Sequence, residues 1–222
     1  MALPGGGTER IGSSTPGLTS WANIGLPCRD YFALWAALLH YSASAASGYN
    51  TWTMEIVQRN EAAPYYFKYI DRISSDDIVS AIGGQLEETI PFLRGISEER
   101  SIHRYAAGKW SIRQVLNHVN DTEQVFLFRA FWFARGFAGP LPSFEQDVSA
   151  VAARSDEFSW ASHIEAFQGI RGATLAFFRN LPLEAWARSG VASGSQVTVK
   201  ALAYIVAGHL AHHRAVLEER YL

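Results

Sequence analysis

The chain has 222 residues and a formal net charge of −2, and 48% of its residues are hydrophobic while 18% are charged. This composition is typical of a globular protein, and the absence of a Lys/Arg excess argues against a nucleic-acid partner bound through a basic face. The single cysteine, Cys28, excludes an internal disulfide and a cysteine-based zinc site, because both need more than one thiol.

A boundary near residue 53 divides the chain into two regions. Residues 1–53 carry only four charged side chains and are rich in Gly, Ser and Ala, without a helical or alternating apolar period. Such a segment buries too little apolar surface to offset its ordering entropy. We therefore predict a disordered or weakly ordered N-terminal extension, and Met54 is a candidate for the true start. The longest apolar run near the N-terminus, residues 31–39, is too short to span a bilayer, so we expect no membrane partner and a cytoplasmic location.

From residue 54 onward the apolar residues recur with helical spacing, which predicts helices over residues 76–95, 112–137, 160–180 and 198–221. The expected N-terminal caps are Ser75, a capping box of Ser111 with Gln114, and Ser159. The residues expected to face inward are Ile78, Ile82, Leu86, Ile90, Leu93, Val115, Val119, Phe126, Phe133, Phe137, Ile164, Phe167, Leu175, Phe178, Leu202, Val206 and Val216.

Four helices of this length fit an all-α protein built as a single four-helix bundle over residues 54–222. The link formed by residues 141–158 is longer than a tight turn and is a candidate crossover. A short helix is expected near residues 183–188, and no strand-like alternation of useful length is found.

Three histidines fall where the bundle core is expected. His209 and His213 lie four residues apart on the inward stripe of the last helix, a spacing that lets two ring nitrogens reach one metal ion. His118 lies at the edge of the inward stripe of the 112–137 helix. Three such ligands would leave coordination positions open, as in catalytic sites, whereas the alternative is hydrogen-bonded core histidines. These ligand types do not distinguish Zn, Ni, Fe, Cu or Mn.

The neighbouring residues refine this interpretation. His212 points off the stripe, so we assign it a supporting or surface role, and Asp121 is a candidate for orienting a ligand as well as an ordinary solvated helix charge. Leu210 follows His209, so the His-Glu-x-x-His pattern of metalloproteases is absent and peptide hydrolysis is disfavoured. His40, His103 and His163 have no comparable partners and are interpreted as solvent or packing residues.

Two arginines fall on inward stripes: Arg129 on the 112–137 helix and Arg171 on the 160–180 helix. A buried guanidinium needs an anionic partner. Both arginines are therefore candidates for binding the carboxylates of a thiol cofactor or substrate. Two alternatives stay open, namely pairing with Asp or Glu inside the protein, and placing the charged head in water.

Two segments that carry the histidines resemble the signature motifs of the DinB/YfiT-like superfamily. Residues 108–118 (GKWSIRQVLNH) end on His118, and residues 207–213 (AGHLAHH) contain His209 and His213. Shorter stretches resemble one branch of it, namely Tyr65-Tyr66 and residues 121–123, 128–130, 134–136 and 171–175. The resemblance covers residues 54–222 and implies a four-helix bundle in which these three histidines hold a divalent metal.

Some members of this superfamily use a low-molecular-weight thiol such as bacillithiol or mycothiol. The resemblance therefore implies a metal-dependent thiol S-transferase acting on a small-molecule substrate, and a metal-dependent hydrolase is the alternative activity. A non-catalytic metal-binding stress-response module also stays open, as does a metal store or sensor with His212 as a fourth ligand. The Phe and Trp residues of the bundle are compatible with a homodimer.

Overall fold

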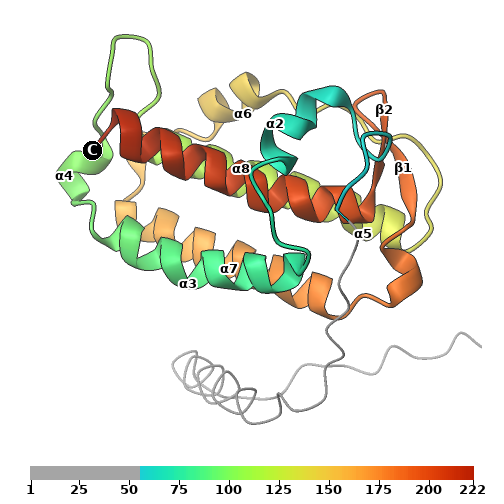
Figure 1. The fold of residues 1–222 in the computed structure, drawn as a ribbon. Coiled ribbons are helices and arrows are strands. Elements are labelled where there is room, and N and C mark those ends of the chain that lie inside the picture. Colours follow the sequence, from blue (N-terminus) through green and yellow to red (C-terminus); the bar gives the residue numbers. More distant parts are fainter. Residues whose placement is uncertain (1–55) are drawn as a thin grey trace, which may run out of the picture. The chain divides into compact units, whose positions relative to one another are not determined.

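The computed structural model describes residues 56–222, and the predicted N-terminal extension lies outside the described residues. Four long helices dominate this part of the chain (Figure 1), namely α3 (Ile78–Arg94), α5 (Ile112–Ala134), α7 (Trp160–Arg179) and α8 (Val199–Arg220). The shorter elements are η2 (Pro64–Tyr66), α2 (Phe67–Ile70), α4 (Glu98–Ser101), α6 (Gln146–Ala152), η3 (Ser155–Glu157), η4 (Leu183–Ala185), β1 (Ser189–Ala192) and β2 (Ser195–Thr198). None of the described helices is long and apolar enough to cross a membrane.

The four long helices form the predicted bundle, but helices that follow one another along the chain are not always neighbours. Helix α3 packs against α7 and α8, and α5 packs against the same two helices. Helices α3 and α5 therefore occupy opposite corners, as do α7 and α8, and the segments that join them cross the ends of the bundle (Figure 1). This arrangement places α5 beside α8, the two helices that carry the candidate metal ligands.

The helix boundaries agree with the predictions except at two ends. The capping box of Ser111 and Gln114 is formed as predicted, and Ser159 caps α7. The cap of α3 is Asp77 rather than Ser75, because the Asp77 carboxylate accepts the hydrogen bond from the Ser80 N–H. The hydroxyl of Ser75 instead bonds the main-chain N–H and carbonyl of Asp77, two residues further along the chain.

Helix α5 ends at Ala134, three residues before the predicted end. Gly136 adopts a φ of +77°, a left-handed conformation that stops the helix at a glycine. The chain turns away at this point, so Phe137 is 48% exposed rather than buried, contrary to the prediction. The other predicted inward residues are buried or packed against the core, with Leu86, Ile90 and Val216 partly buried at its margin.

The fold is all-α as predicted apart from one small antiparallel hairpin between η4 and α8, which no alternation in the sequence indicated. Strand β1 pairs with β2 in a register that places Ala192 opposite Ser195. The two residues between them, Ser193 and Gly194, both have positive φ, which is the backbone of a tight hairpin turn. A Ser-Gly pair is a recognised turn signal, but the flanking strands are too short for alternation to reveal them.

The bundle core consists of two apolar clusters separated by a polar layer. One cluster lies toward the hairpin end and includes Phe126 and Val206, and the other lies toward the opposite end and includes Val119 and Leu210. Between these levels each long helix contributes polar side chains. They are Gln85 on α3, His118, Thr122 and Glu123 on α5, Arg171 and Thr174 on α7, and His209 on α8.

Two glycines allow smaller elements to press against the bundle beside this layer. A Cβ atom at Gly208 would lie 2.1 Å from the carbonyl oxygen of Tyr69, so α2 crosses α8 at the distance that only glycine permits. A Cβ atom at Gly190 would lie 2.1 Å from the ring of Phe133, so the hairpin closes directly on α5. Both contacts bring side chains from outside the bundle to its polar layer.

We predict that Gly208→Ala destabilises the protein by roughly 1–3 kcal/mol, because the new methyl group collides with the main chain of α2 and not with a flexible side chain. Gly172→Ala on α7 is the matched control. No atom lies within 4 Å of its Cβ position, so it should stabilise the helix by up to about 1 kcal/mol. Urea unfolding of both variants measures the difference. Equal stability of Gly208→Ala and wild type would contradict the packing of α2 on α8.

Candidate metal centre

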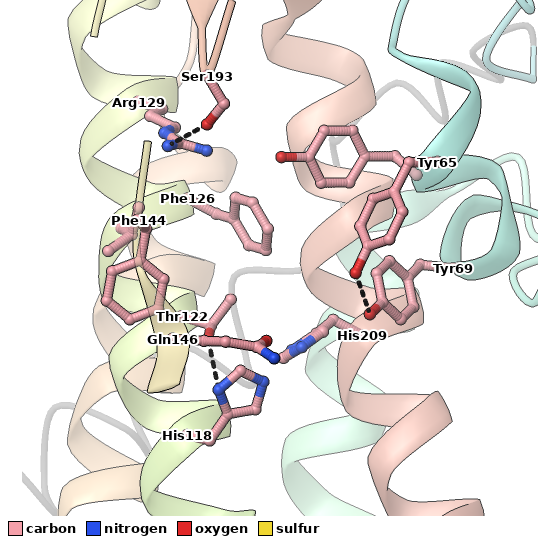
Figure 2. Close-up of a pocket in the computed structure, with 12 residues that line it drawn as sticks. Tyr65, Tyr69, His118, Thr122, Phe126, Arg129, Phe144, Gln146, Ser193 and His209 are labelled. Atoms are coloured by element: carbon pink, nitrogen blue, oxygen red, sulfur yellow. Dashed lines mark hydrogen bonds between the residues drawn. The ribbon is translucent and has the colours of Figure 1, made fainter. Parts of the chain in front are cut away.

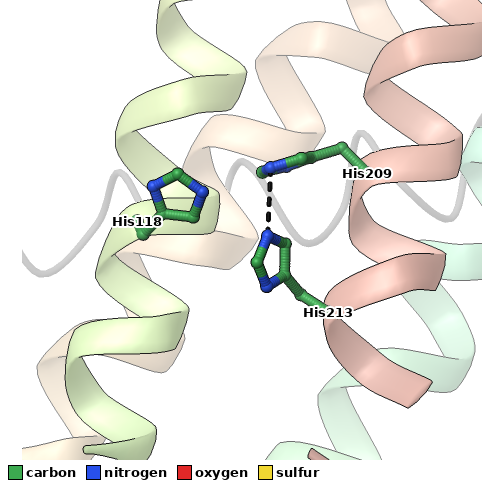
Figure 3. Close-up of side chains that lie close together, drawn as sticks. All are labelled: His118, His209 and His213. Atoms are coloured by element: carbon green, nitrogen blue, oxygen red, sulfur yellow. Dashed lines mark hydrogen bonds between the residues drawn. The ribbon is translucent and has the colours of Figure 1, made fainter. Parts of the chain in front are cut away.

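Helices α5 and α8 bring the three predicted histidines together. His118 projects from α5 toward His209 and His213, which stand one turn apart on α8 (Figure 3). One ring nitrogen from each residue lies within 4.8 Å of the other two. The ring centroids of His118 are 5.1 Å from His209 and 5.0 Å from His213. The chain segments are about 90 residues apart, so the bundle topology, not local sequence, creates this convergence.

The spacing of the nitrogens fits ligands of one ion. The Nε2 atoms of His209 and His213 are 3.1 Å apart and share a hydrogen bond. Two nitrogens bound to one tetrahedral zinc ion at about 2.0 Å are roughly 3.3 Å apart. The Nδ1 atom of His118 lies 3.3 Å from the hydroxyl of Thr122. In the tautomer that donates Nδ1–H to this hydroxyl, the Nε2 lone pair of His118 remains for a ligand role.

Burial keeps these imidazoles unprotonated. Desolvation lowers the pKa of His118 to about 4, and the nearby Asp147 carboxylate opposes this shift. Desolvation, assisted by His118, His212 and Lys68, lowers the pKa of His213 to about 3. Desolvation, assisted by His213, His118, His212 and Arg171, places the pKa of His209 well below its usual value. Neutral imidazole is the form that binds metals, so the rings are in the correct state near neutral pH.

A pocket opens beside two of the three rings. His118 and His209 form part of its lining, and its volume is about 100 Å³ (Figure 2). The remaining lining comes from η2, α2, α5, the start of α6 with the residues before it, and the hairpin turn. It includes Tyr65, Tyr66, Tyr69, Thr122, Val125, Phe126, Arg129, Phe144, Gln146 and Ser193. A ligand in this pocket would lie against the ring nitrogens, so the arrangement leaves room for a substrate.

The other predicted candidates do not join the three rings. His212 packs its ring against Tyr69 at 5.4 Å and lies outside the cluster of converging nitrogens. Asp121 accepts hydrogen bonds from Asn117 and Ser149, so its carboxylate secures α6 on α5 instead of orienting a histidine. His163 is buried and bonds the carbonyl of Ser155, a packing role as predicted. His40 lies outside the described residues.

The two arginines have different surroundings. Arg171 is fully buried, and its Nη2 lies 3.0 Å from the Glu123 carboxylate, which matches the ion-pair alternative that the sequence left open. Burial raises the pKa of Glu123 and lowers that of Arg171, and each charge offsets the shift of the other. Arg129 lines the pocket and is 4% exposed, and its Nη2 donates to the Pro142 carbonyl and the Ser193 hydroxyl.

Several pocket residues escaped the sequence analysis. Thr122 is the i+4 neighbour of His118, so helical spacing alone could have identified it as a partner. Tyr69 lies with its ring 5.1 Å from His209, and its hydroxyl is 3.5 Å from that of Tyr65 (Figure 2). Its role depends on the close packing at Gly208, which no local pattern predicts. Ser193 depends on the hairpin, which was not predicted.

Comparisons with known proteins agree with this architecture. Residues 82–217 match the family model described as the DinB superfamily. YfiT from Bacillus subtilis, described as a probable metal-dependent hydrolase with an unusual four-helix bundle topology, superposes with a TM-score of 0.58 at 14% identity. The match covers 79% of this chain and 93% of YfiT. No curated protein sequence matches.

A second solved structure shares the fold. The mycothiol-dependent maleylpyruvate isomerase superposes with a TM-score of 0.55 at 11% identity, over 65% of this chain and 61% of the isomerase. At these identities the two structures establish a common fold, not a common activity.

We predict that the Glu123–Arg171 pair is structural. Glu123→Leu leaves a buried guanidinium without a carboxylate and should cost roughly 3–5 kcal/mol of unfolding free energy. Glu123 Oε1 and Arg171 Nε have no hydrogen-bond partner among the described residues, so the pair is incompletely satisfied. The double variant Glu123→Leu/Arg171→Met should therefore recover most of the loss. Urea unfolding of the single and double variants tests this, and a double variant as unstable as Glu123→Leu would be the contrary result.

Proposed function

We propose that this chain, which belongs to the DinB superfamily, is a metal-dependent enzyme that uses a small thiol as the nucleophile toward a small electrophilic substrate. The observation that carries the proposal is the convergence of three buried imidazoles at the edge of a pocket. A divalent ion held there would lower the pKa of a coordinated thiol or water and so supply a nucleophile near neutral pH.

The residues around the rings support an open site over a closed one. His118, His209 and His213 would supply three ligands, and no fourth His, Cys, Asp or Glu among residues 56–222 joins the cluster. His212 is held against Tyr69. Three protein ligands with an adjoining pocket are typical of catalytic sites, whereas a metal store needs a complete ligand shell. Thr122 would fix the orientation of His118, and the surrounding aromatic rings would limit the access of water.

The two structural relatives favour different nucleophiles. The isomerase is described as mycothiol-dependent, which supports a thiol, and YfiT is described as a probable metal-dependent hydrolase, which supports water. Hydrolysis is therefore our second candidate. Peptide hydrolysis is disfavoured for this chain, because Leu210 occupies the position that a metalloprotease fills with its glutamate base.

We predict that the protein, purified without a His tag, binds one divalent metal ion per chain. His118→Ala, His209→Ala and His213→Ala should each reduce the metal affinity by at least about tenfold, because each removes one of three ligands. Metal content by mass spectrometry and competition with a chelator measure the change.

His212→Ala is the matched control, since the His212 ring packs 5.0 Å from that of His213 but is not part of the group of converging nitrogens. This variant should retain the metal. Full metal retention by His118→Ala would contradict the proposed ligand set, and loss of metal from His212→Ala would favour the closed four-ligand shell.

We predict that the metal-loaded protein catalyses thiol-dependent substitution of 1-chloro-2,4-dinitrobenzene, in which the thiol sulfur replaces chloride and a proton and a chloride ion are released. The assay uses cysteine, mycothiol and bacillithiol in turn, and His209→Ala should fall to the uncatalysed rate. A parallel assay with 4-nitrophenyl acetate in the absence of thiol detects hydrolysis. Ester hydrolysis alone would favour the second candidate, and turnover of neither probe with metal bound would contradict an enzymatic role.

A further inference from the structure

The pocket has a second polar end, which is formed by Arg129. This side chain is 4% exposed, and its guanidinium faces the same pocket as His118 and His209 (Figure 2). We propose that Arg129 binds a carboxylate on the ligand of this pocket, so that the ligand is a small organic acid whose reacting group lies at the other end. This inference rests on the proposed function for the reacting end, while the anion-binding end follows from Arg129 itself.

Arg129 has no anionic partner inside the described part of the protein. Its Nη2 donates to two neutral oxygens, the carbonyl of Pro142 and the hydroxyl of Ser193, each at 2.9 Å. No Asp or Glu among residues 56–222 forms an ion pair with it, and its Nε and Nη1 donate no hydrogen bond there. A buried cation is costly without a counter-charge, so an anion from outside the chain would complete this environment.

The contrast with Arg171 shows that the fold supplies a counter-charge where a guanidinium is purely internal. Arg171 lies in the same core, is fully buried, and has the Glu123 carboxylate at 3.0 Å. It does not line the pocket. Arg129 is nearly as buried, lacks such a carboxylate and faces the pocket. The two arginines are equivalent in sequence pattern, but only Arg129 is placed to receive an anionic ligand.

The geometry of α5 fixes how the two ends of the pocket are related. Arg129 follows His118 by three helical turns on one face, which separates their Cα atoms by roughly 16 Å. Helical side chains lean toward the N-terminus, so the Arg129 side chain extends back toward His118. Its Cζ atom lies 5.9 Å from the centre of the Phe126 ring, between the two ends. A ligand that reaches both ends must therefore be extended and must carry its charge away from the reacting group.

The middle of the pocket suits an apolar body. Phe126 and Phe144 lie between the histidines and Arg129, and Tyr66 packs edge-on against Phe126 with centroids 6.0 Å apart. These rings offer apolar contact with no additional charge. The chemical class is thus a short aliphatic or aromatic chain with a carboxylate at one end and a thiol or an electrophilic carbon at the other.

The hairpin turn positions the Arg129 guanidinium at the anion-binding end of the pocket. Ser193 has a φ of +52°, which is unusual for a residue other than glycine, and its hydroxyl accepts from Arg129. The turn reaches this position because Gly190 allows β1 to contact the Phe133 ring. Two acceptors on one Nη2 orient the guanidinium plane and leave its other N–H groups for a carboxylate.

The test compares two ligands of equal length that differ only at the remote end: 6-mercaptohexanoate and 6-mercaptohexan-1-ol. Ligand-observed NMR titration of the metal-free protein measures both affinities. Wild type should prefer the carboxylate by at least about tenfold, as a charge-assisted hydrogen bond predicts. Arg129→Gln should abolish this preference while leaving the affinity for the alcohol unchanged, and Arg129→Lys should keep part of it.

Arg135→Gln is the matched control, because it removes the same charge from an exposed position beyond the end of α5. It should leave the preference intact. Equal binding of the two ligands by wild type, or binding of neither, would overturn the inference without any variant, so a poorly folded Arg129→Gln cannot obscure the outcome. An equal loss in Arg135→Gln would also overturn it, by assigning the preference to net charge.

Repeating the titration with cobalt-loaded protein separates this inference from the proposed function. Coordination of the thiolate to cobalt is followed by its near-ultraviolet absorption band. A preference in metal-free protein without metal binding would support the Arg129 site and contradict the metal centre. A cobalt–thiolate band of equal strength for both ligands, with no preference in either form of the protein, would support the metal centre and contradict the Arg129 site.

Discussion

The main constraint on this structure is that three unprotonated imidazoles are buried between two apolar clusters, which costs free energy that other interactions must offset. An apolar core would normally continue through this level of the bundle, and each polar ring placed there loses hydrogen bonds to water. Among residues 56–222, His209 and His213 form one hydrogen bond, with each other, and His118 forms one with Thr122. Three lone-pair donors that point at one region are compensated best by a shared cation, so an ion-binding role follows from the energetics of burial as well as from the spacing of the ligands.

The bundle topology converts this polar layer into an accessible site. Because α3 and α5 occupy opposite corners, α5 lies directly beside α8, and the connecting segments cross the bundle instead of forming tight turns. Those segments supply the hairpin and the chain at the start of α6, which line the pocket together with α5 and with η2 and α2 ahead of α3. Gly190 lets the hairpin contact α5 closely, and Gly208 lets α2 contact α8 closely. The bundle thus holds the ligands, and its connections determine what can reach them.

Helical periodicity and local capping predicted the bundle, as the Ser111 box illustrates, and placed each of the three histidines on or beside an inward stripe. That the three histidines meet followed from the resemblance of residues 108–118 and 207–213 to the superfamily motifs. The sequence did not predict the pocket, since that depends on contacts between distant segments. Ser193 reaches the pocket because of a hairpin whose four-residue strands are too short to show alternation. Tyr69 reaches it because the main chain of α2 contacts α8 at Gly208. Phe137 was misplaced because one glycine conformation ends α5 three residues early.

The separation of charge and chemistry within the pocket has a functional consequence. A carboxylate held at Arg129 contributes binding energy far from the reacting atoms, and this energy can orient the substrate in the transition state. If the anionic group instead bound beside the histidines, it would compete with the nucleophile for the open metal positions. Arg129 is the only Arg or Lys among the described residues that line the pocket, and it lies three turns of α5 away from His118. This separation avoids the competition. The same helix then fixes the distance between anchor and nucleophile, so the length of the ligand becomes the main determinant of specificity.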